Sequence, residues 1–281
     1  MTELTIRRMQ AEDLAAGLRL TQAQSWAYRL EDWSFHFRLG RGWVACDPGG
    51  RVLGTALWWP YGERFATIGL VIVGRDQQGK GIGRRLMDVV MSDAGSRTLQ
   101  LVATTAGRKL YRQCGFREVS GIFQQQGLVV AAPLPEDVRG DVLRKVTRDD
   151  IATIARWDAT AFSSHRQHIV ETILETGDGL LAERDGRLAG YALARRAGRG
   201  TTVGPVVAED EILAIELIAG ALERAGGFCR LDVPADATRL SAWLETVGLK
   251  RVDQAAVMTR GTALPRQGTA RVFGLVSQAL T

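Results

Sequence analysis

Residues 66–91 read ATIGLVIVGRDQQGKGIGRRLMDVVM and combine three kinds of local sequence. The first, residues 66–73, is β-branched and apolar, as expected for a buried strand. The second, residues 78–83, is a turn dense in glycine, and the third, residues 84–91, has apolar residues at helical spacing. The stretch therefore predicts a strand, a glycine-rich loop and a helix in direct succession.

The glycine-rich loop has the features of a diphosphate cradle. A turn that opens directly into a helix presents backbone N–H groups at the positive end of the helix dipole. Gly81 and Gly83 leave room for a ligand beside the backbone, and Lys80 and Arg84 add positive charge. A pair of glycines before a helix is also typical of an ordinary tight turn, so the loop alone does not decide the function.

Two common phosphate-binding motifs do not fit this loop. The Walker pattern requires Ser or Thr after its lysine, whereas Gly81 follows Lys80. The dinucleotide fingerprint requires a third glycine at the position of Leu86. Gln78, Gly81 and Gly83 instead match every defined position of a third pattern, Gln or Arg, two residues, Gly, one residue, Gly or Ala. In this the loop resembles the acetyl-CoA motif of the GNAT N-acetyltransferase superfamily.

The resemblance implies that acetyl-CoA is the cofactor and indicates which residues bind it. In that family the strand before the loop carries a bulge whose backbone binds the pantetheine arm, here Leu70, Val71, Ile72 and Val73. The amides of the loop hold the pyrophosphate, which implies a role for Gln78, Gly79, Lys80, Gly81, Ile82, Gly83 and Arg84. Thr104, at the end of the next strand, is a further candidate for contact with the pantetheine.

A second match to the family lies in residues 110–116, LYRQCGF. The usual ending in the family is LY, three residues and GF, which puts Tyr111 at the tyrosine position. When an amine attacks a thioester, the leaving CoA thiolate needs a proton, and a neutral tyrosine with an ordinary pKa of about 10 can donate one. We therefore predict that Tyr111 is the general acid. The alternative is a tyrosine on an amphipathic helix with its hydroxyl at the surface.

The sequence defines the general base and the acceptor site less clearly. Many family members have an acidic residue on or beside the strand before the loop, but residues 66–73 contain none. Glu63 and Asp32 are the candidates, with proton relay through water as an alternative. The aromatic residues upstream indicate either core packing or an acceptor pocket for an apolar or cationic amine. The candidates for such a pocket are Trp26, Tyr28, Trp33 and Trp58.

The chain is a degenerate repeat of one α/β unit. Residues 5–14 match residues 142–151, a strand followed by an acidic helix start in both copies. Residues 42–58 match residues 179–194, which have the signature of a hairpin. Two further matches, of the helix after the loop and of the segment around Tyr111, follow in the same order at a nearly constant shift. Each copy therefore has the order strand, helices, hairpin, strand, loop, helix, strand, helix, strand.

A proline-containing linker over residues 131–141 separates the copies, and we predict domains over residues 1–137 and 138–281. The resemblance implies an α/β (α+β) fold of two tandem GNAT-like domains. Each would have a mixed, mostly antiparallel central sheet flanked by helices. The tail after Pro265 is expected to pack back onto one of the domains.

The second copy lacks both motifs of the first. The repeat places Glu209 opposite Gln78, Ile212 opposite Gly81 and Leu244 opposite Tyr111, and several acidic residues replace the basic ones. We predict that this domain has no acetyl-CoA site, and that it shapes the acceptor cleft or stabilises the first domain.

Composition and charge agree with this interpretation. Lys and Arg number 36 against 31 Asp and Glu, and the excess is scattered rather than gathered into a nucleic-acid-binding stripe. The 3 cysteines are far apart, and no window has the length and apolarity of a membrane span. We expect a cytoplasmic protein with no nucleic-acid or membrane partner and no metal.

The sequence thus favours an N-acetyltransferase that transfers acetyl from acetyl-CoA to a primary amine by direct attack in a ternary complex. The acceptor would be a small molecule or a peptide. Two alternatives are a non-catalytic acyl-CoA-binding sensor and a protein- or RNA-modifying acetyltransferase. The identity of the acceptor and the oligomeric state are not encoded in any motif.

Overall fold

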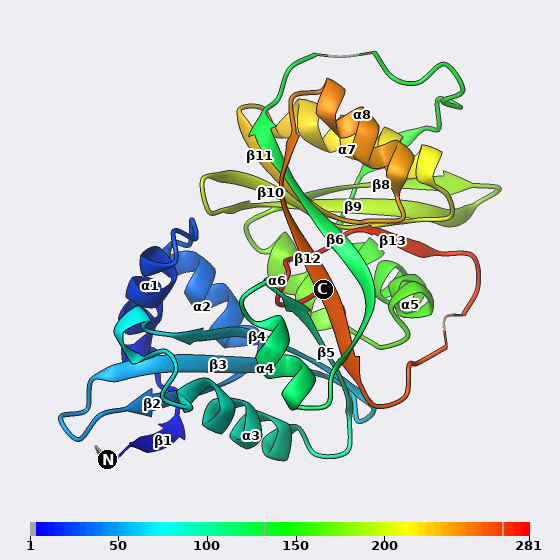
Figure 1. Ribbon diagram of the computed structural model, residues 1–281. Coiled ribbons are helices and arrows are strands. Elements are labelled where there is room, and N and C mark those ends of the chain that lie inside the picture. The colour runs from blue at the N-terminus through cyan, green and yellow to red at the C-terminus, as the bar shows by residue number, and fades with distance from the viewer. Residues whose placement is uncertain (1–3, 132, 266) are drawn as a thin grey trace.

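The computed structural model describes residues 4–131, 133–265 and 267–281, which form two units of similar architecture (Figure 1). The first half of the chain contains β1 (Thr5–Arg8), α1 (Leu14–Ala23), α2 (Leu30–Leu39), β2 (Arg41–Cys46), β3 (Val52–Tyr61), β4 (Phe65–Val73), α3 (Ile82–Ala94), β5 (Thr98–Ala103), α4 (Arg108–Gln113) and β6 (Arg117–Leu128). The second half contains β7 (Leu143–Lys145), α5 (Ile151–Phe162), α6 (Gln167–Leu174), β8 (Asp178–Arg184), β9 (Arg187–Ala197), β10 (Gly200–Ala208), α7 (Glu211–Ala225), β11 (Phe228–Pro234), α8 (Thr238–Thr246), β12 (Lys250–Arg260) and β13 (Arg271–Gly274).

Apart from β13, the two halves have the same order of helices and strands, as the repeat predicts. Neighbouring strands are mostly antiparallel, and the parallel pairs are β4 with β5 and β10 with β11. The predicted α/β fold with a mixed, mostly antiparallel sheet and flanking helices is confirmed. No helix among the described residues is long and apolar enough to cross a membrane.

The two halves exchange their last strands. The strand order is β1-β2-β3-β4-β5-β12-β6-β11-β10-β9-β8-β7, so β5 of the first half pairs with β12, and β11 of the second half pairs with β6. β6 and β12 lie side by side as the long pair that joins the two units (Figure 1). The predicted boundary after residue 137 lies between β6 and β7, so a chain cut there would separate each sheet from one of its strands.

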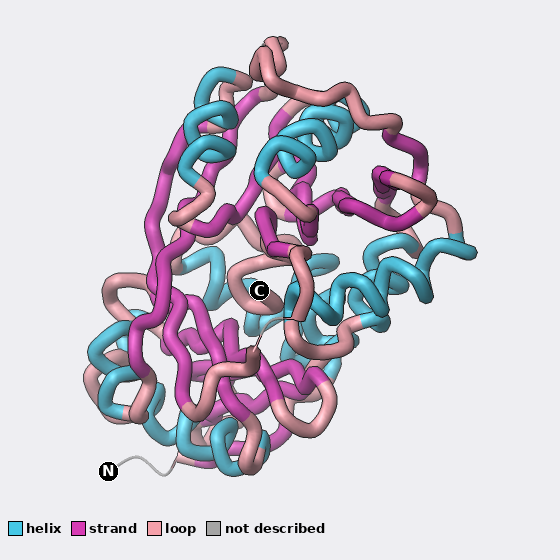
Figure 2. The backbone as a smooth tube through the Cα atoms, turned by 90° about the vertical axis from the view of Figure 1, so that its right-hand side faces the viewer, coloured by secondary structure: helices cyan, strands magenta, loops and turns pink. Residues whose placement is uncertain are grey.

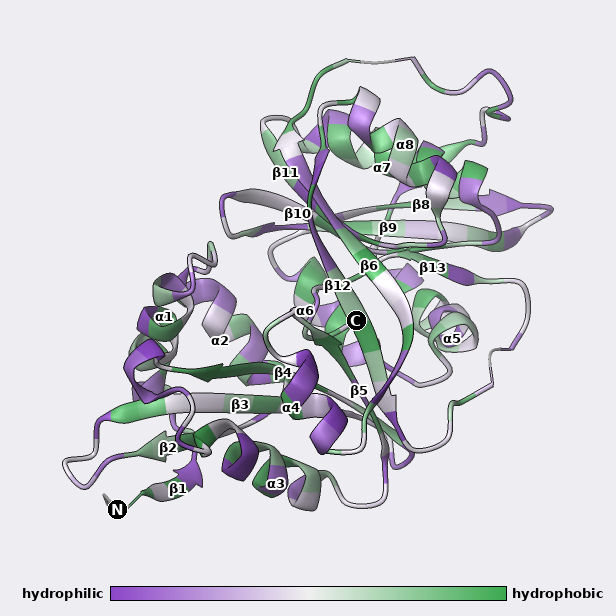
Figure 3. Ribbon diagram, in the orientation of Figure 1, coloured by the Kyte–Doolittle hydropathy of each residue, from purple (hydrophilic) through white to green (hydrophobic). Residues whose placement is uncertain are grey.

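Helices cover both faces of the strands (Figure 2). α3 and α4 lie on one face of the first sheet, where Ile68, Leu86 and Leu101 are fully or almost fully buried. In Figure 3 α3 alternates between hydrophilic and hydrophobic residues, because only one side of this helix meets the sheet. The other face shares a core with the second half, in which Trp33 and Ile173 are fully buried.

The end of the chain connects both halves. β13 pairs with β10, and the following residues 275–281 enter the space between the two units. Tyr61 donates a hydrogen bond to the backbone oxygen of Leu280 over 3.0 Å, and a Cβ at Gly69 would lie 2.7 Å from the Cβ of Ala279. The tail therefore packs against both halves, whereas the sequence suggested only one.

Candidate active site

β4 and β5 separate along their length and leave a gap. They pair from Phe65 with Thr98 as far as Ile68 with Leu101, and no pairing follows. The rest of β4, residues 69–73, and the end of β5 therefore form the two sides of a wedge. On the side of β4 that faces β5, these residues have no strand partner in the described part of the chain.

A bulge in β4 lies at this gap. Gly69 is opposite Leu57 and Ile72 is opposite Thr55, so β4 contains one more residue than β3 between these pairs. Leu70 has φ +49°, a left-handed conformation that costs a leucine ~1–3 kcal/mol. The bulge that the family resemblance implied at Leu70 to Val73 is present, and the strained residue lies in it.

Thr55 holds the bulge in place. Its hydroxyl, fully buried, donates a hydrogen bond of 2.8 Å to the carbonyl oxygen of Leu70. Because the C=O and the following N–H of a trans peptide point in opposite directions, we expect the N–H of Val71, which has no partner in β3, to point away from Thr55 and toward the gap. No sequence motif pointed to Thr55, the one threonine of β3.

The N-terminus of α3 is open beside the gap. Gly81 precedes the helix with φ +79°, and no side chain caps it. The first amide to bond back is that of Arg85, to the carbonyl of Gly81 over 3.1 Å. The N–H groups of Ile82, Gly83 and Arg84 thus have no partner among the described residues. A Cβ at Gly81 would meet no atom within 4 Å, so an anion has room to reach these amides.

The loop before α3 is tied to the bulged strand. The side-chain amide of Gln78 donates to the carbonyl of Val73 over 3.1 Å. Gly79 has φ +77° and open space at its Cβ position, and Lys80 is exposed and contacts Gln77. The arrangement fits the pyrophosphate of CoA, which would lie against backbone amides with positive charge nearby.

Tyr111 lies on α4, next to the same loop. A Cβ at Gly83 would lie 3.2 Å from Leu110 and 3.7 Å from Val73, so Gly83 is in contact with both α4 and the end of β4. A Cβ at Gly107 would lie 2.8 Å from the Tyr111 ring and 3.5 Å from the hydroxyl of Thr104. Bulged strand, helix N-terminus, Thr104 and Tyr111 therefore surround one gap.

The environment of Tyr111 keeps its phenol neutral. The side chain is buried, and its ring contacts Phe116 with centroids 6.3 Å apart. Burial raises the pKa of Tyr111 well above the ordinary value of 10.0. The hydroxyl forms no hydrogen bond with any residue that the structure describes, so it is available to a group that enters the gap.

In the second half the equivalent gap is filled by the chain itself. β10 and β11 pair only at Thr201 and Thr202, which again leaves a wedge. β13 lies in this wedge and pairs with β10 at Val206 and Val207. Leu275, the residue after β13, donates its amide to the carbonyl of Asp232 in β11 over 2.9 Å. A pantetheine arm would have to displace this strand.

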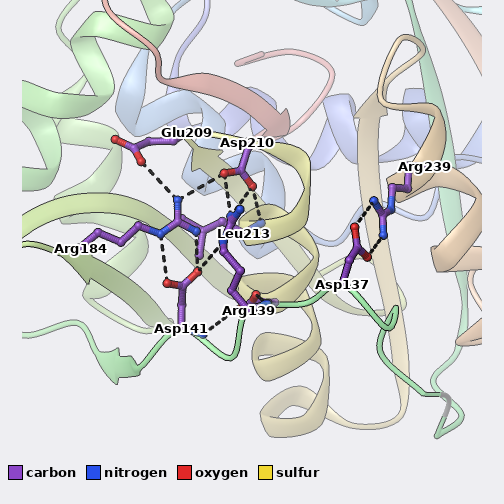
Figure 4. A network of polar contacts seen from close by, with 9 residues as sticks. Asp137, Arg139, Asp141, Arg184, Glu209, Asp210, Leu213 and Arg239 are labelled. Atoms are coloured by element: carbon purple, nitrogen blue, oxygen red, sulfur yellow. Dashed lines mark hydrogen bonds and ion pairs between the residues drawn. The ribbon is translucent and has the colours of Figure 1, made fainter.

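The N-terminus of α7 is closed as well. Asp210 caps the helix by accepting a hydrogen bond of 2.9 Å from the amide of Leu213. Arg139 and Arg184 bind the Asp210 carboxylate, and Asp141 bridges to Arg184 (Figure 4). The carboxylate of Asp210 thus occupies the N-terminus of α7, where it binds the amide of Leu213 and brings negative charge to the place of a diphosphate.

The predicted equivalence of Glu209 with Gln78 and of Ile212 with Gly81 is wrong. Residues 74–81 connect β4 to α3, whereas only residues 209–210 connect β10 to α7, so a constant shift cannot align the two loops. The equivalence of Leu244 with Tyr111 holds. The amide of Leu249 bonds the carbonyl of Leu244 as the amide of Phe116 bonds that of Tyr111. The second half has no phenol at this position.

The two candidates for the general base lie in different places. Glu63 is exposed in the turn before β4. At ~3.3 Å per residue it is on the order of 20 Å from Leu70, so the geometry does not support it. Asp32 is buried and caps α2, where its carboxylate accepts hydrogen bonds of 2.9 Å from the amides of Arg29 and Gly198.

The aromatic residues predicted for the acceptor site also lie in different places. Trp33 and Trp58 belong to the core, where the indole of Trp33 donates to Thr21 and that of Trp58 to Asp93. Trp26 is partly buried at the edge of the shared core. Tyr28 lines a cavity between the two halves, together with Asp32 and residues of the second half.

Comparison with known proteins agrees with this geometry. Two family models, each described as an acetyltransferase (GNAT) domain, match residues 38–118 and 154–274, together more than two thirds of the chain. The uncharacterized N-acetyltransferase YitH of Bacillus subtilis is 26% identical over 220 residues, which are 77% of either chain.

Solved structures resemble the whole chain. A structure from Pyrococcus horikoshii that carries the name acetyltransferase matches with a TM-score of 0.80 and 19% identity, over 99% of this chain and 96% of its own. A tandem GNAT protein from the clavulanic acid biosynthesis pathway matches with a TM-score of 0.63 and 16% identity, over 93% of this chain and 100% of its own. At these identities the likeness concerns the fold.

The fold, the gap in the first half and the two family matches define an N-acetyltransferase of the GNAT class. The chain belongs to the GNAT superfamily in its two-domain form, with one domain in each half. Enzymes of this superfamily generally use acetyl-CoA and transfer its acetyl group to an acceptor.

Proposed function

We propose that the first half binds acetyl-CoA in the gap between β4 and β5 and that the enzyme transfers the acetyl group to a primary amine. The observation that carries the proposal is the contrast between two copies of one fold. In the first, the wedge and the helix N-terminus are open, and in the second they are filled by β13 and by Asp210. A ligand site accounts for the open copy.

The residues of the gap divide the binding between them. The amides of Ile82, Gly83 and Arg84 would hold the pyrophosphate, and Lys80 adds charge at the rim. The N–H of Val71, which Thr55 directs into the gap, would bind the pantetheine arm. Thr104 lies across the gap from the bulge, at the end of β5, and would contact the same arm.

The reaction is a direct transfer. The lone pair of a neutral amine attacks the thioester carbonyl, the C–N bond forms, and the C–S bond breaks. The phenol of Tyr111 gives its proton to the leaving thiolate, the proton lost by the amine passes to water, and solvent returns a proton to Tyr111 after the product leaves. Water is preferred to Asp32 because the carboxylate of Asp32 is already engaged by Arg29 and Gly198.

The discriminating experiment measures release of free CoA thiol by the purified protein with acetyl-CoA and a panel of primary amines. The proposal predicts release that depends on the amine and an acetylated product of equal amount. A protein that binds CoA with affinity unaffected by amines, and that yields no acetylated product from any of them, would be an acyl-CoA sensor. No affinity for CoA at all would refute both functions.

A further inference from the structure

A small cavity lies where the two halves meet, behind the candidate active site. Tyr28, Asp32 and His36 of the first half line one side, and Arg195 and Arg230 of the second half line the other. Its volume is ≈ 50 Å³, room for a few water molecules or for one polar head group. The cavity thus fits one end of a small molecule.

Arg195 is the unusual residue of this cavity. Its side chain is only 7% exposed, but its Nε has no hydrogen-bond partner among the described residues. The one carboxylate near it, Asp32, is 3.5 Å away, at the limit of a hydrogen bond. The guanidinium stacks on Phe35, with its carbon 4.0 Å from the ring centre. A buried guanidinium with one long contact and an unpartnered Nε has unused capacity to bind an anion.

Asp32 gives Arg195 one long contact, and the described residues offer no acceptor to its Nε. Asp32 is neutralised by Arg29, and Asp232 pairs with Arg230 over 2.8 Å, so both carboxylates of the cavity have other partners. His36 carries no charge, because burial lowers its pKa to about 4. The cavity therefore has excess positive charge from Arg195, with Arg199 at its rim. Burial lowers the pKa of Arg195, although the carboxylate of Asp32 opposes this shift.

The C-terminal segment connects the cavity to the active site. Ser277 lines the cavity and bonds His36 over 3.1 Å, while Ala279 lies against Gly69, the residue before the bulge. Two residues of chain span less than ~8 Å, so the cavity lies near the bulge.

We propose that Arg195 of the second half binds an oxyanion of the acceptor, so that the preferred substrate is a small primary amine with a carboxylate or phosphate group. The inference rests on the proposed transfer reaction and assigns a substrate class to it. It gives the second half, which has no CoA site of its own, a part in selecting the acceptor.

Binding of acceptors to the protein saturated with CoA tests this inference without turnover. The probes are γ-aminobutyrate, O-phosphoethanolamine and butylamine, measured calorimetrically with wild type and with Arg195→Gln. We expect Arg195→Gln to weaken binding of the preferred oxyanion amine ~10–100-fold, the worth of a charge-assisted hydrogen bond. Binding of butylamine should not change. The tighter of the two oxyanion probes identifies carboxylate or phosphate.

Two further variants separate charge from folding. Arg196→Gln removes the same charge from the next residue of β9, which is exposed, and should bind all three probes like wild type. Arg195→Lys keeps the positive charge but lacks the planar set of N–H donors of a guanidinium, and should give intermediate affinity. The inference is overturned if neither oxyanion amine binds wild type, if Arg195→Gln binds both as tightly, or if it loses butylamine equally. A titration with CoA alone reports separately on the proposed function.

Discussion

At the scale of single residues, the site depends on a few contacts that place backbone groups as much as side chains. Leu70 has a backbone conformation that leucine rarely adopts, and the hydroxyl of Thr55 binds its carbonyl. Strain of this kind persists only where the surrounding structure compensates for it. We therefore expect Thr55 to act on the ligand through the bulge rather than by contact.

Replacement of Thr55 by the isosteric valine tests this role. Thr55→Val leaves the buried carbonyl of Leu70 without its partner, which should lower the free energy of unfolding by ~1–3 kcal/mol. The N–H of Val71 is then no longer held toward the gap, so we expect the Kd for acetyl-CoA to rise several-fold. Denaturant unfolding and a CoA titration measure the two effects. Loss of stability with an unchanged Kd would show that Thr55 is only structural.

Tyr111 is the proposed general acid. In Tyr111→Phe the ring still packs against Phe116, so we expect the KM for acetyl-CoA to stay the same while kcat falls ~100-fold or more. Steady-state kinetics with saturating amine measure both. An unchanged kcat would exclude Tyr111 as the acid.

The pH dependence follows from the raised pKa of Tyr111. The phenol stays protonated beyond its ordinary pKa, whereas the amine must lose its proton to attack. In wild type kcat/KM should therefore rise with pH and show no alkaline decline below about pH 10. A decline near neutral pH would indicate a different acid.

At the scale of structural elements, the two copies differ mainly in one connection and one added strand. The loop before α3 ends in glycine and leaves the helix open, whereas the short connection before α7 ends in a capping aspartate. The positive end of α3 is therefore the element that the site adds to the shared fold.

An aspartate in place of Gly81 should close the first copy in the manner of the second. Gly81→Asp brings a carboxylate to the helix N-terminus, and we expect acetyl-CoA affinity to fall ~10-fold or more by repulsion and competition for the amides. Gly62→Asp is the matched control, because Gly62 has a similar φ of +70° and equally open space in the turn between β3 and β4. It should bear the same strain and keep its affinity for CoA. Equal losses in the two variants would argue against a cradle at α3.

The sequence predicted those parts of the candidate site whose residues lie close together along the chain. The order of Gln78, Gly81 and Gly83, and the spacing to Tyr111, are set by neighbours along the chain, so the motif alone predicted an open helix N-terminus with a tyrosine beside it. Thr55 and Arg195 were missed because their partners, Leu70 and the cavity, come from other strands. The predicted equivalence of the loops before α3 and α7 was wrong, because a constant shift between the repeats does not show that one connection is shorter than the other. Trp33 and Trp58 show that aromatic crowding alone does not separate core from pocket.

At the scale of the whole molecule, the exchange of β6 and β12 makes one continuous sheet from the two copies. The sequence did not predict this exchange, because β6 and β12 follow equivalent helices and either strand could pair with either sheet. The insertion of β13 also depends on contacts far apart in the chain. The second half therefore completes the first sheet with β12 and contributes one wall of the cavity beside it.

The shared sheet predicts that the two halves unfold together. Calorimetry should show a single thermal transition whose calorimetric and van't Hoff enthalpies agree. CoA at 100 times its Kd should stabilise the whole transition by ~2.7 kcal/mol, although it binds only the first half. Two separate transitions, of which CoA shifts one, would show that the halves are independent.

One of the two copies of the fold is open, and we propose that only this copy binds CoA. Calorimetric titration gives the number of CoA molecules bound per chain. We predict one molecule per chain in wild type, and loss of that site in Gly81→Asp. Two molecules per chain, or one that binds Gly81→Asp as tightly as wild type, would refute a single site in the first half.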